Sequence, residues 1–323
     1  MKAMLVKELG LPSKMELTDV PSPEPGKKEV LIEIRACSVN FPDTLMVQGL
    51  YQFKPELPFA PGSDVAGVVK AVGEAVKHVK VGDDVFGLVA HGGFAEEVVV
   101  PAKSVFPKPP GMDYKTAASF MMAYGTSYHA LKDRAKLQAG ETLVVLGASG
   151  GVGIAAVELG KQMGARVIAC ASTDDKLDLC RQYGADATIN YREENLKSRI
   201  KELTDGKGAD VVYDPVGGDY TEAALRATAW EGRFLIVGFP AGIAKIPMNL
   251  PLLKGCQICG VFWGSFALRD PRRNQQNTLE LIQLYGQGKL KPYIQKTYSL
   301  ADSRQALTDM MDRKVMGKIV IEP

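Results

Sequence analysis

The stretch Thr142 to Gly153, with the sequence TLVVLGASGGVG, constrains the fold of this chain more than any other segment. Its first five residues, Thr142 to Leu146, are apolar or β-branched, a pattern typical of a strand buried on both faces. Four glycines follow, and glycine tolerates positive φ angles and close approach of the backbone. The helix predicted at Gly151 to Met163 would direct the N–H groups of its first turn toward the same point. The segment therefore predicts a site for a pyrophosphate at the junction of strand and helix.

The glycine pattern departs from the dinucleotide fingerprint G-x-G-x-x-G, because an extra residue separates Gly147 from the GGVG core. A glycine-rich turn without a ligand is the alternative for these residues alone. The chain that follows favours the nucleotide site, because predicted strands and helices alternate along it. Such alternation indicates right-handed crossovers and a parallel, doubly wound sheet. The strands are predicted at 165–172, 187–189, 209–214 and 233–238, and the helices at 174–183, 193–203 and 219–228.

Length and composition restrict the class of protein. A chain of 323 residues is long enough for two domains, and its net charge of +2 comes without a run of Lys or Arg, so charge gives no indication of nucleic-acid binding. No apolar run approaches the length of a membrane span and the start lacks a signal-peptide pattern, so a cytoplasmic protein is expected. The cysteines form no regular framework, which favours a reducing compartment, and the C-x-x-C at Cys256 and Cys259 is expected to pack within a strand.

The first 120 or so residues differ in pattern from the middle of the chain. Short apolar stretches separated by Pro and Gly turns, such as PSPEPGKK and VKVGDDV, predict a partly open β-barrel. We therefore predict a barrel domain at 1–120, a dinucleotide-binding domain at 121–264, and a segment at 265–323 that returns to the first domain. Residues Ile246 to Trp263 are expected to form a pair of edge strands, and an uncovered apolar edge invites pairing with another chain.

This order of barrel, inserted nucleotide domain and short return resembles the medium-chain dehydrogenase/reductase superfamily. The resemblance runs nearly end to end and is closest to the zinc-free quinone oxidoreductase branch, which includes zeta-crystallin, and to its quinone oxidoreductase-like group. It implies a GroES-like catalytic domain, a Rossmann domain and a homodimer formed through the apolar edge. The stretches that carry it include RACSVNFPDTLMVQGLYQ, LPFAPGSDVAGVV, AYGTSYHAL, GASGGVG, VVYDPVGG, WEGRFLIVGF and LPLLKGCQICGVFWG.

Three positions in the sequence indicate whether this chain binds a catalytic metal. Zinc-dependent relatives carry Cys and a His-Glu pair at the positions that here are Asn40, Ser63 and Asp64. A catalytic zinc needs three protein ligands of N, S or O type, and the three histidines lie at unrelated positions, so no metal is expected. Hydride transfer without a Lewis acid suits quinones and α,β-unsaturated carbonyls better than simple alcohols.

The expected cofactor is NADPH. The strand at 165–172 ends without the carboxylate that NAD-specific sites place there, and Asp174 and Asp175 are expected to cap and charge the next helix. Attraction between Lys176 and a 2′-phosphate would favour NADPH over NADH about tenfold to a hundredfold. A solvated helix lysine is the alternative. The resemblance places Lys176 and Tyr191 at the adenosine phosphate, where Lys318 is expected to add charge.

The nicotinamide end is expected to involve Asn40, Asp43, Tyr51 and Thr126. A hydride that reaches the acceptor pushes negative charge onto its carbonyl oxygen, so the site needs a neutral donor. Tyr51 is the first choice. Asn40 either donates too or holds the nicotinamide ribose or the barrel loop. Asp43 follows Pro42 and is expected near a helix N-terminus. No dedicated general acid is expected, because the product anion of a quinone is a weak base.

Further cofactor contacts are expected where strands end at the cleft. The predicted cofactor residues are Asn40, Thr126, Gly150, Gly151, Val152, Gly153, Ser172, Lys176, Tyr191, Gly238, Phe239, Phe262, Trp263, Gly264 and Lys318, and the segments Leu50 to Phe53 and Trp263 to Leu268 are expected to line the acceptor.

The sequence therefore predicts an NADPH-dependent reductase of quinones or activated enones. One alternative is a reductase of enoyl thioesters or 2-alkenals, although no basic patch for the coenzyme A phosphates is evident. A nucleotide-binding protein with an RNA-binding or structural role is the alternative from another class, and the low net charge argues against RNA.

Overall fold

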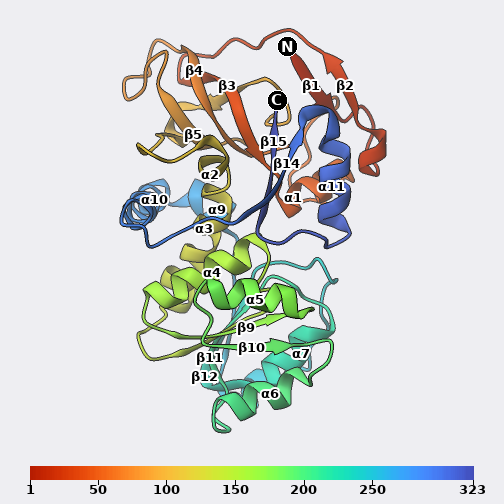
Figure 1. The fold of residues 1–323 in the computed structure, drawn as a ribbon, viewed down its shortest axis with the longest axis vertical. Helices are drawn as coiled ribbons and strands as arrows, with labels where there is room; N and C mark the ends of the chain where they lie inside the picture. Colours follow the sequence, from red (N-terminus) through yellow and green to blue (C-terminus); the bar gives the residue numbers. More distant parts are fainter. The chain divides into compact units, whose positions relative to one another are not determined.

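The computed structural model describes all 323 residues, and the chain divides into two compact units (Figure 1). The first unit comprises Met1–Met122 and Pro292–Pro323, and the second comprises Ala123–Lys291. The predicted α/β class is confirmed, but the boundaries differ from the predicted ones. The first division falls inside a helix, and the second unit extends to Lys291 rather than to Gly264. No helix is long and apolar enough to span a bilayer.

A seven-stranded sheet is the framework of the first unit. Its strand β3 (Glu29–Ser38) is long because it has partners on both sides: β4 (Asp64–Val72) lies along one side, and two strands share the other. β6 (Glu97–Pro101) pairs with the first half of β3, and β15 (Lys318–Glu322) pairs with its end. The sheet also contains β5 (Asp84–Leu88), β7 (Val105–Pro107) and β14 (Ile294–Ser299), while β1 (Lys2–Leu5) and β2 (Glu16–Asp19) form a separate ribbon.

The C-terminal segment completes this sheet. β15 runs antiparallel to β3, with Val320 opposite Ser38 and Ile321 opposite Cys37. Alternate residues of both strands are buried in one apolar core, which fixes the register. The pairing therefore brings residue 318 close to the chain that follows β3. The helices of this unit are α1 (Phe41–Val47), α2 (Tyr114–Ala118) and α11 (Ser303–Met311), with short 3-10 helices at Pro12–Lys14, Ala102–Ser104 and Leu300–Asp302.

The second unit contains the predicted parallel, doubly wound sheet (Figure 1). Its strands lie in the order β10-β9-β8-β11-β12-β13, so the direction of winding reverses between β8 and β11. Residues 143–145 of β8 and residues 211–212 of β11 are apolar and fully buried, as expected for strands with both faces covered. The strands are β8 (Thr142–Val145), β9 (Arg166–Ala171), β10 (Ala187–Asn190), β11 (Ala209–Asp214), β12 (Thr228–Ile236) and β13 (Gln257–Gly260).

The helices between β8 and β12 follow the predicted order. Helix α6 begins three residues later than predicted, because the side chain of Asn195 accepts a hydrogen bond from the N–H of Ser198 and caps it there. The helices of the second unit are α3 (Met121–Tyr128), which starts in the first unit, α4 (Gly151–Gln162), α5 (Asp174–Gln182), α6 (Leu196–Leu203), α7 (Asp219–Arg226), α8 (Asn249–Lys254), α9 (Trp263–Arg269) and α10 (Pro271–Gly286), with a π-helix at His129–Ala135.

The prediction of a pair of edge strands at Ile246 to Trp263 is wrong, because only one strand, β13, forms there. The preceding residues form helix α8, where Pro251 sits in the first turn and loses no intrahelical hydrogen bond. Gly255 ends the helix in the left-handed region, at a φ of +57°. The apolar run is therefore a helix followed by a strand.

Helix α10 also differs from its predicted place, because it belongs to the second unit. The Lys132 ammonium lies 3.0 Å from the Asn277 amide oxygen and pairs with the Glu280 carboxylate. These contacts fasten α10 to the π-helix, so only residues 292–323 return to the first unit.

Candidate functional site

The glycine-rich turn between β8 and α4 is the first part of the predicted site. Helix α4 begins at Gly151, directly after Gly150, whose carbonyl accepts the N–H of Ile154 at 2.8 Å. The N–H groups in the first turn of a helix have no partner within the helix. Those of Gly151, Val152 and Gly153 therefore form a site of positive partial charge that suits an anion.

Gly153 allows α4 to approach the preceding turn closely. A Cβ added at Gly153 would lie 2.3 Å from the carbonyl oxygen of Gly147 and 2.8 Å from the backbone of Ala148, closer than real Cβ contacts. Gly147 has a φ of +55°, which also favours glycine. The turn therefore needs glycine at both positions, and its bare backbone can approach a pyrophosphate.

The predicted adenosine end lies at the carboxyl ends of β9 and β10. Asn190 of β10 pairs with Ala171 of β9, so Tyr191 and Ser172 follow paired residues of neighbouring strands. The ammonium of Lys176 lies 3.5 Å from the hydroxyl oxygen of Ser172. This edge of the sheet therefore offers a cation, a hydroxyl and an aromatic ring.

The acidic residues that follow β9 have a structural role. Asp174 and Asp175 occupy the first turn of α5, where carboxylates complement the helix dipole. The Asp174 carboxylate also accepts a hydrogen bond from the side-chain amide of Asn190 at 3.1 Å. Asp174 is therefore occupied within the protein.

The predicted cofactor residues that follow β12 and β13 differ in their exposure to solvent. Phe239 and Phe262 are about half exposed, and Gly238 and Gly264 adjoin them. Trp263 is only 4% exposed, and its indole N–H donates to the side-chain oxygen of Asn274 at 2.9 Å.

The Trp263 ring packs on helix α3. A Cβ added at Gly125 would lie 2.6 Å from this ring. The side chain of Trp263 is therefore part of the packing beside Thr126, and only its backbone remains for a ligand.

In the first unit, Asn40 and Asp43 are joined at the start of α1. The Asp43 carboxylate accepts the backbone N–H of Asn40 at 2.8 Å and that of Gly62 at 3.3 Å. This agrees with the helix N-terminal position predicted for Asp43. Burial raises the pKa of Asp43 to about 6, although both N–H groups and Lys318 oppose this shift.

Lys318 lies in the same buried cluster. Its side chain is 4% exposed, and its ammonium donates to the Asn40 side-chain oxygen at 2.5 Å and to the Val39 carbonyl at 3.2 Å. The sequence predicts Lys318 at the adenosine phosphate, but its ammonium is engaged within the first unit beside Asn40. The pairing of β15 with the end of β3 accounts for this position.

Asp64 adds a second buried carboxylate to the cluster. One oxygen accepts the N–H of Met122 at 3.1 Å and the Ser38 hydroxyl at 3.4 Å, and the other, Oδ1, has no hydrogen-bond partner. Burial raises the pKa of Asp64 to about 7, and Lys318 opposes this shift.

Tyr51 lies on the loop after α1 and packs, partly buried, against the core of the first unit. Burial and then the charge of Asp43 raise the pKa of its hydroxyl above the usual value of 10.0, so the group stays protonated and can donate at neutral pH. Leu50 and Phe53 beside it are exposed, and Phe53 stacks on the ring of His91. The loop therefore presents apolar side chains next to a hydroxyl donor.

The structure brings together no group of three or more His, Cys, Asp or Glu side chains that could hold a metal ion. Among the histidines, His129 contacts the Asp133 carboxylate at 2.8 Å. His78 contacts the Val105 carbonyl at 3.3 Å.

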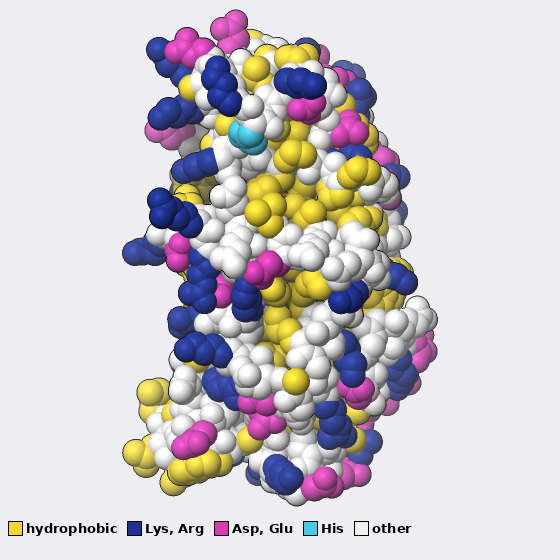
Figure 2. Space-filling model, turned by 90° about the vertical axis from the view of Figure 1, so that its left-hand side faces the viewer, with side chains coloured by type: hydrophobic (Ala, Val, Ile, Leu, Met, Phe, Trp, Pro, Cys, Tyr) yellow, Lys and Arg dark blue, Asp and Glu magenta, His cyan; other side chains and the backbone are white.

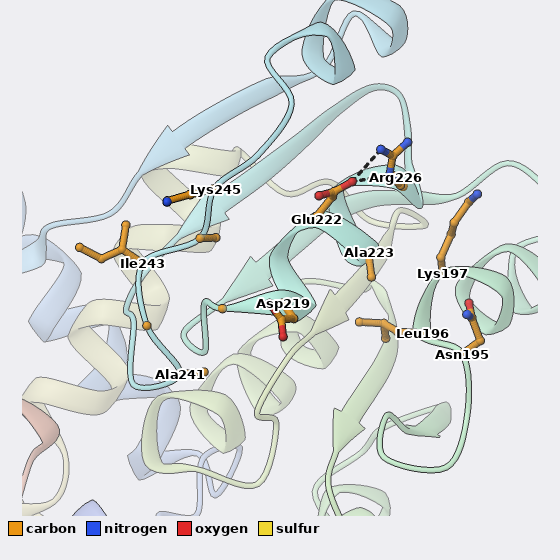
Figure 3. Close-up of a pocket in the computed structure, with 13 residues that line it drawn as sticks. Asn195, Leu196, Lys197, Asp219, Glu222, Ala223, Arg226, Ala241, Ile243 and Lys245 are labelled. Atoms are coloured by element: carbon orange, nitrogen blue, oxygen red, sulfur yellow. Dashed lines mark hydrogen bonds and ion pairs between the residues drawn. The ribbon is translucent and has the colours of Figure 1, made fainter.

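A surface hollow of about 630 Å³ lies in the second unit, between α6, α7 and the loop at 241–245 (Figure 3). Its lining carries both signs of charge, and Arg226 is paired with Glu222 at 2.6 Å. None of the predicted site residues lines it. We therefore assign it no part in the site.

Sequence reasoning missed Ser38 as a neighbour of Asn40. It placed Asp64 beside Asn40 only as the position of a lost zinc ligand, and it missed Lys318 as the cation near both. A weak signal existed, because Asp64 directly precedes the stretch VAGVV and Lys318 directly precedes the stretch IVI. A charged residue in an apolar strand is often buried with a partner. The partner itself lies far away in sequence and cannot be read locally.

Comparison with known proteins extends these observations to the whole chain. Residues 26–110 match the family model described as "Alcohol dehydrogenase GroES-like domain", and residues 151–283 match the one described as "Zinc-binding dehydrogenase". A quinone oxidoreductase-like protein 2 homolog of Nematostella vectensis is 40% identical over 99% of this chain and 88% of its own length. The quinone oxidoreductase of Pseudomonas aeruginosa is 35% identical over 97% of both chains.

Solved structures agree with this. The quinone oxidoreductase of Escherichia coli complexed with NADPH has a TM-score of 0.94 at 28% identity, with both chains fully covered. A probable oxidoreductase from Mycobacterium abscessus has a TM-score of 0.91 at 37% identity over 100% of this chain and 99% of its own. Fold and site together thus define an oxidoreductase of the medium-chain dehydrogenase/reductase superfamily, with a GroES-like and a Rossmann-type domain. Within this superfamily, the chain belongs to the quinone oxidoreductase family.

Proposed function

We propose that this protein is an NADPH-dependent reductase of quinones or activated α,β-unsaturated carbonyls that works without zinc. The turn at Gly147 to Gly153 carries the proposal, because its bare backbone and the first turn of α4 fit a pyrophosphate. Relatives in the family support it, since the Escherichia coli enzyme was crystallised with NADPH. When bound, NADPH supplies a hydride to an electrophilic carbon of the acceptor.

The adenosine end supports NADPH over NADH. An NAD-specific site needs a free carboxylate at the end of β9 to accept the ribose hydroxyl. Asp174 is instead bonded to Asn190, and Lys176 lies beside Ser172. A lysine at this place attracts the 2′-phosphate that only NADPH carries.

The first unit supplies the donors for the acceptor. Tyr51 keeps its proton at neutral pH and can donate to a carbonyl oxygen that gains negative charge. Asn40 stands where zinc-dependent relatives carry a ligand, and an amide is a poor zinc ligand but a good donor. Stabilisation of an oxyanion by neutral donors suits acceptors that need only modest polarisation.

A panel of acceptors tests this function. Consumption of NADPH would be followed with para-quinones, ortho-quinones, 2-alkenals and enoyl thioesters, and the purified chain would be assayed for zinc. We expect turnover with a quinone or an enone carbonyl and no stoichiometric metal. Turnover restricted to thioesters would move the assignment to that substrate class. NADPH binding without turnover on any acceptor would favour a binding protein, and stoichiometric zinc would refute the zinc-free scheme.

We also propose a homodimer formed through the β13 edge. β13 is the last strand of its sheet, and the neighbouring Trp230, Leu252 and Leu253 are 69%, 80% and 65% exposed. Hydrophobic side chains gather at the lower left corner of the face in Figure 2. Apolar surface beside an open strand edge favours pairing with a second copy. Sedimentation of a monomer at micromolar concentration would count against this.

A cytoplasmic location completes the proposal. All five cysteines are free and buried, which fits a reducing compartment. Fractionation of the cells that produce the protein would test it.

A further inference from the structure

We infer that Lys318 is a positioning residue, whose ammonium fixes the side-chain amide of Asn40 so that only its N–H groups are available to a ligand. The inference rests on the proposed function, because it specifies how Asn40 serves that site. It also changes the role predicted for Lys318, from binding a phosphate to orienting a neighbour.

The orientation of the Asn40 amide follows from the chemistry of its partners. An ammonium has three donors and no acceptor, so the Asn40 atom 2.5 Å from the Lys318 nitrogen must be the oxygen. At the other end, the Asn40 nitrogen lies 3.4 Å from both the carbonyl and the hydroxyl oxygen of Ser38. The amide is therefore held at both ends and cannot rotate to present its oxygen.

The consequence is that Asn40 acts as a donor. Its oxygen is occupied by Lys318, and its two N–H bonds meet only the long contacts to Ser38. A ligand at this place must therefore offer an acceptor, such as a ribose hydroxyl oxygen or the carbonyl oxygen of the substrate. The arrangement favours an oxyanion over a neutral carbonyl, because donors gain strength as negative charge develops.

Buried carboxylates near Lys318 favour the charged form of its side chain. A lone ammonium inside a protein is strongly unfavourable, but Asp43 and Asp64 are both fully buried in the same cluster. Both carboxylates oppose the effect of burial, which lowers the pKa of Lys318. The facing thiol of Cys37 completes the set of titratable groups around it. The cluster thus holds a charged donor beside the side-chain oxygen of Asn40.

Lys318→Met tests the inference, because methionine has a similar length and no donor. We expect kcat with the best acceptor to fall tenfold to a hundredfold, while KM for NADPH changes less than threefold. Lys318→Arg, which also only donates, should recover part of kcat. Lys108→Met is the matched control, since Lys108 is a largely buried lysine of the same unit that donates to the Met112 carbonyl at 2.8 Å.

A second readout does not depend on activity. The side-chain amide of Asn40 can be followed by NMR of the ¹⁵N-labelled protein and assigned through Asn40→Asp. Its proton exchange should be slow in the wild type and at least tenfold faster in Lys318→Met. If the wild type reduces no acceptor, the proposed function fails, while this measurement still decides the role of Lys318.

The double variant Lys318→Met/Asp64→Asn protects the test against misfolding, because it removes one positive and one negative charge together. We expect it to fold, judged by thermal unfolding, and to keep the low kcat and the fast amide exchange. Folded variants with wild-type kcat and wild-type exchange would overturn the inference. A rise of more than tenfold in KM for NADPH at unchanged kcat would overturn it too and return Lys318 to the phosphate.

Discussion

The candidate site of the second unit and the candidate site of the first unit are built in opposite ways. In the second unit, the phosphate site is formed by the consecutive residues 147–153 and relies on backbone N–H groups and on missing side chains. In the first unit, the site around Asn40 is formed by side chains from β3, β4, α1 and β15. The site of the second unit is local and carries partial charges that do not titrate. The site of the first unit is non-local and contains Asp43, Asp64 and Lys318, which do titrate.

This difference decides how each of the two sites responds to a substitution or to a change in pH. A backbone site fails when a side chain is added, because the added atoms meet backbone that cannot move aside. A buried charge cluster fails when its charges become unbalanced, and pH alone can do that. The following experiments are designed to test this contrast.

The largest effect is expected from Gly153→Ala. The added Cβ would meet the Gly147 carbonyl oxygen at 2.3 Å, so α4 has to move away from the turn. We expect a loss of about 3 kcal/mol in the free energy of unfolding and at least a hundredfold weaker NADPH binding. Urea unfolding and fluorescence titration with NADPH measure the two effects.

Gly150→Ala is the matched control for stability. Its Cβ would meet only the same carbonyl oxygen, at 3.4 Å, and Gly150 has an ordinary φ of −77°. We expect a loss below about 1 kcal/mol. If Gly153→Ala instead binds NADPH within threefold of the wild type, the turn at 147–153 does not bind the cofactor through its bare backbone as described.

Lys176→Ala removes a charged side chain that is predicted to bind the cofactor in the second unit. The 2′-phosphate exists only in NADPH, so loss of the ammonium should reduce the ratio of kcat/KM for NADPH to that for NADH by about tenfold to a hundredfold. The effect should shrink in high salt. Lys161→Ala, which removes a cation paired with Asp186 at 2.7 Å, should leave the ratio unchanged. An unchanged ratio in both variants would contradict the predicted role of Lys176.

The same contrast explains what could be predicted from the sequence. The parallel, doubly wound sheet follows from the alternation of apolar strands and amphipathic helices, and the glycine turn is contiguous, so both could be predicted. Helix α8 was missed because its apolar residues fit a strand equally well by composition. The deciding features, Pro251 in the first turn and the positive φ of Gly255, are visible only in the structure.

The cluster of the first unit could be predicted only in part. Asn40 and Asp43 share one helix turn and were found through the resemblance. Lys318 reaches them across a strand pairing between segments 278 residues apart. Its burial follows from that pairing, so sequence analysis placed it near the adenosine phosphate instead. Non-local charge pairs of this kind cannot be read from local pattern.

Asp64→Asn tests the buried charge cluster of the first unit through the pH dependence of the free energy of unfolding. The pKa of Asp64 is about 7 in the folded chain, against 3.8 without the effect of folding. The folded state therefore binds more protons than the unfolded one in this window, and the stability of the wild type falls as pH rises through it. Asp64→Asn has no carboxyl group at this position, so its stability does not fall in this way as the pH rises. We expect it to gain on the order of 2 kcal/mol relative to the wild type between pH 5 and pH 8.

Urea unfolding at several pH values measures this gain. Asp186→Asn is the control from the second unit, because Lys161 and other partners hold the pKa of Asp186 below its usual value. Its titration lies below pH 5, so its stability relative to the wild type should not change between pH 5 and pH 8. Parallel curves for Asp64→Asn and the wild type would mean that the buried cluster does not titrate as described.

The smallest effect is expected from Tyr51→Phe. The hydroxyl contributes one neutral hydrogen bond to the developing oxyanion, so turnover should fall about threefold to tenfold, or about 1 kcal/mol. Because burial and Asp43 raise the pKa of Tyr51, its ionisation should leave no inflection in the rate between pH 6 and pH 9. Tyr114→Phe is the control, since the Tyr114 hydroxyl donates to the Asp84 carboxylate at 2.5 Å, away from the cluster around Asn40. A fall beyond about a thousandfold, over 4 kcal/mol, would make Tyr51 an essential acid, and the first unit would then supply a proton as well as donors.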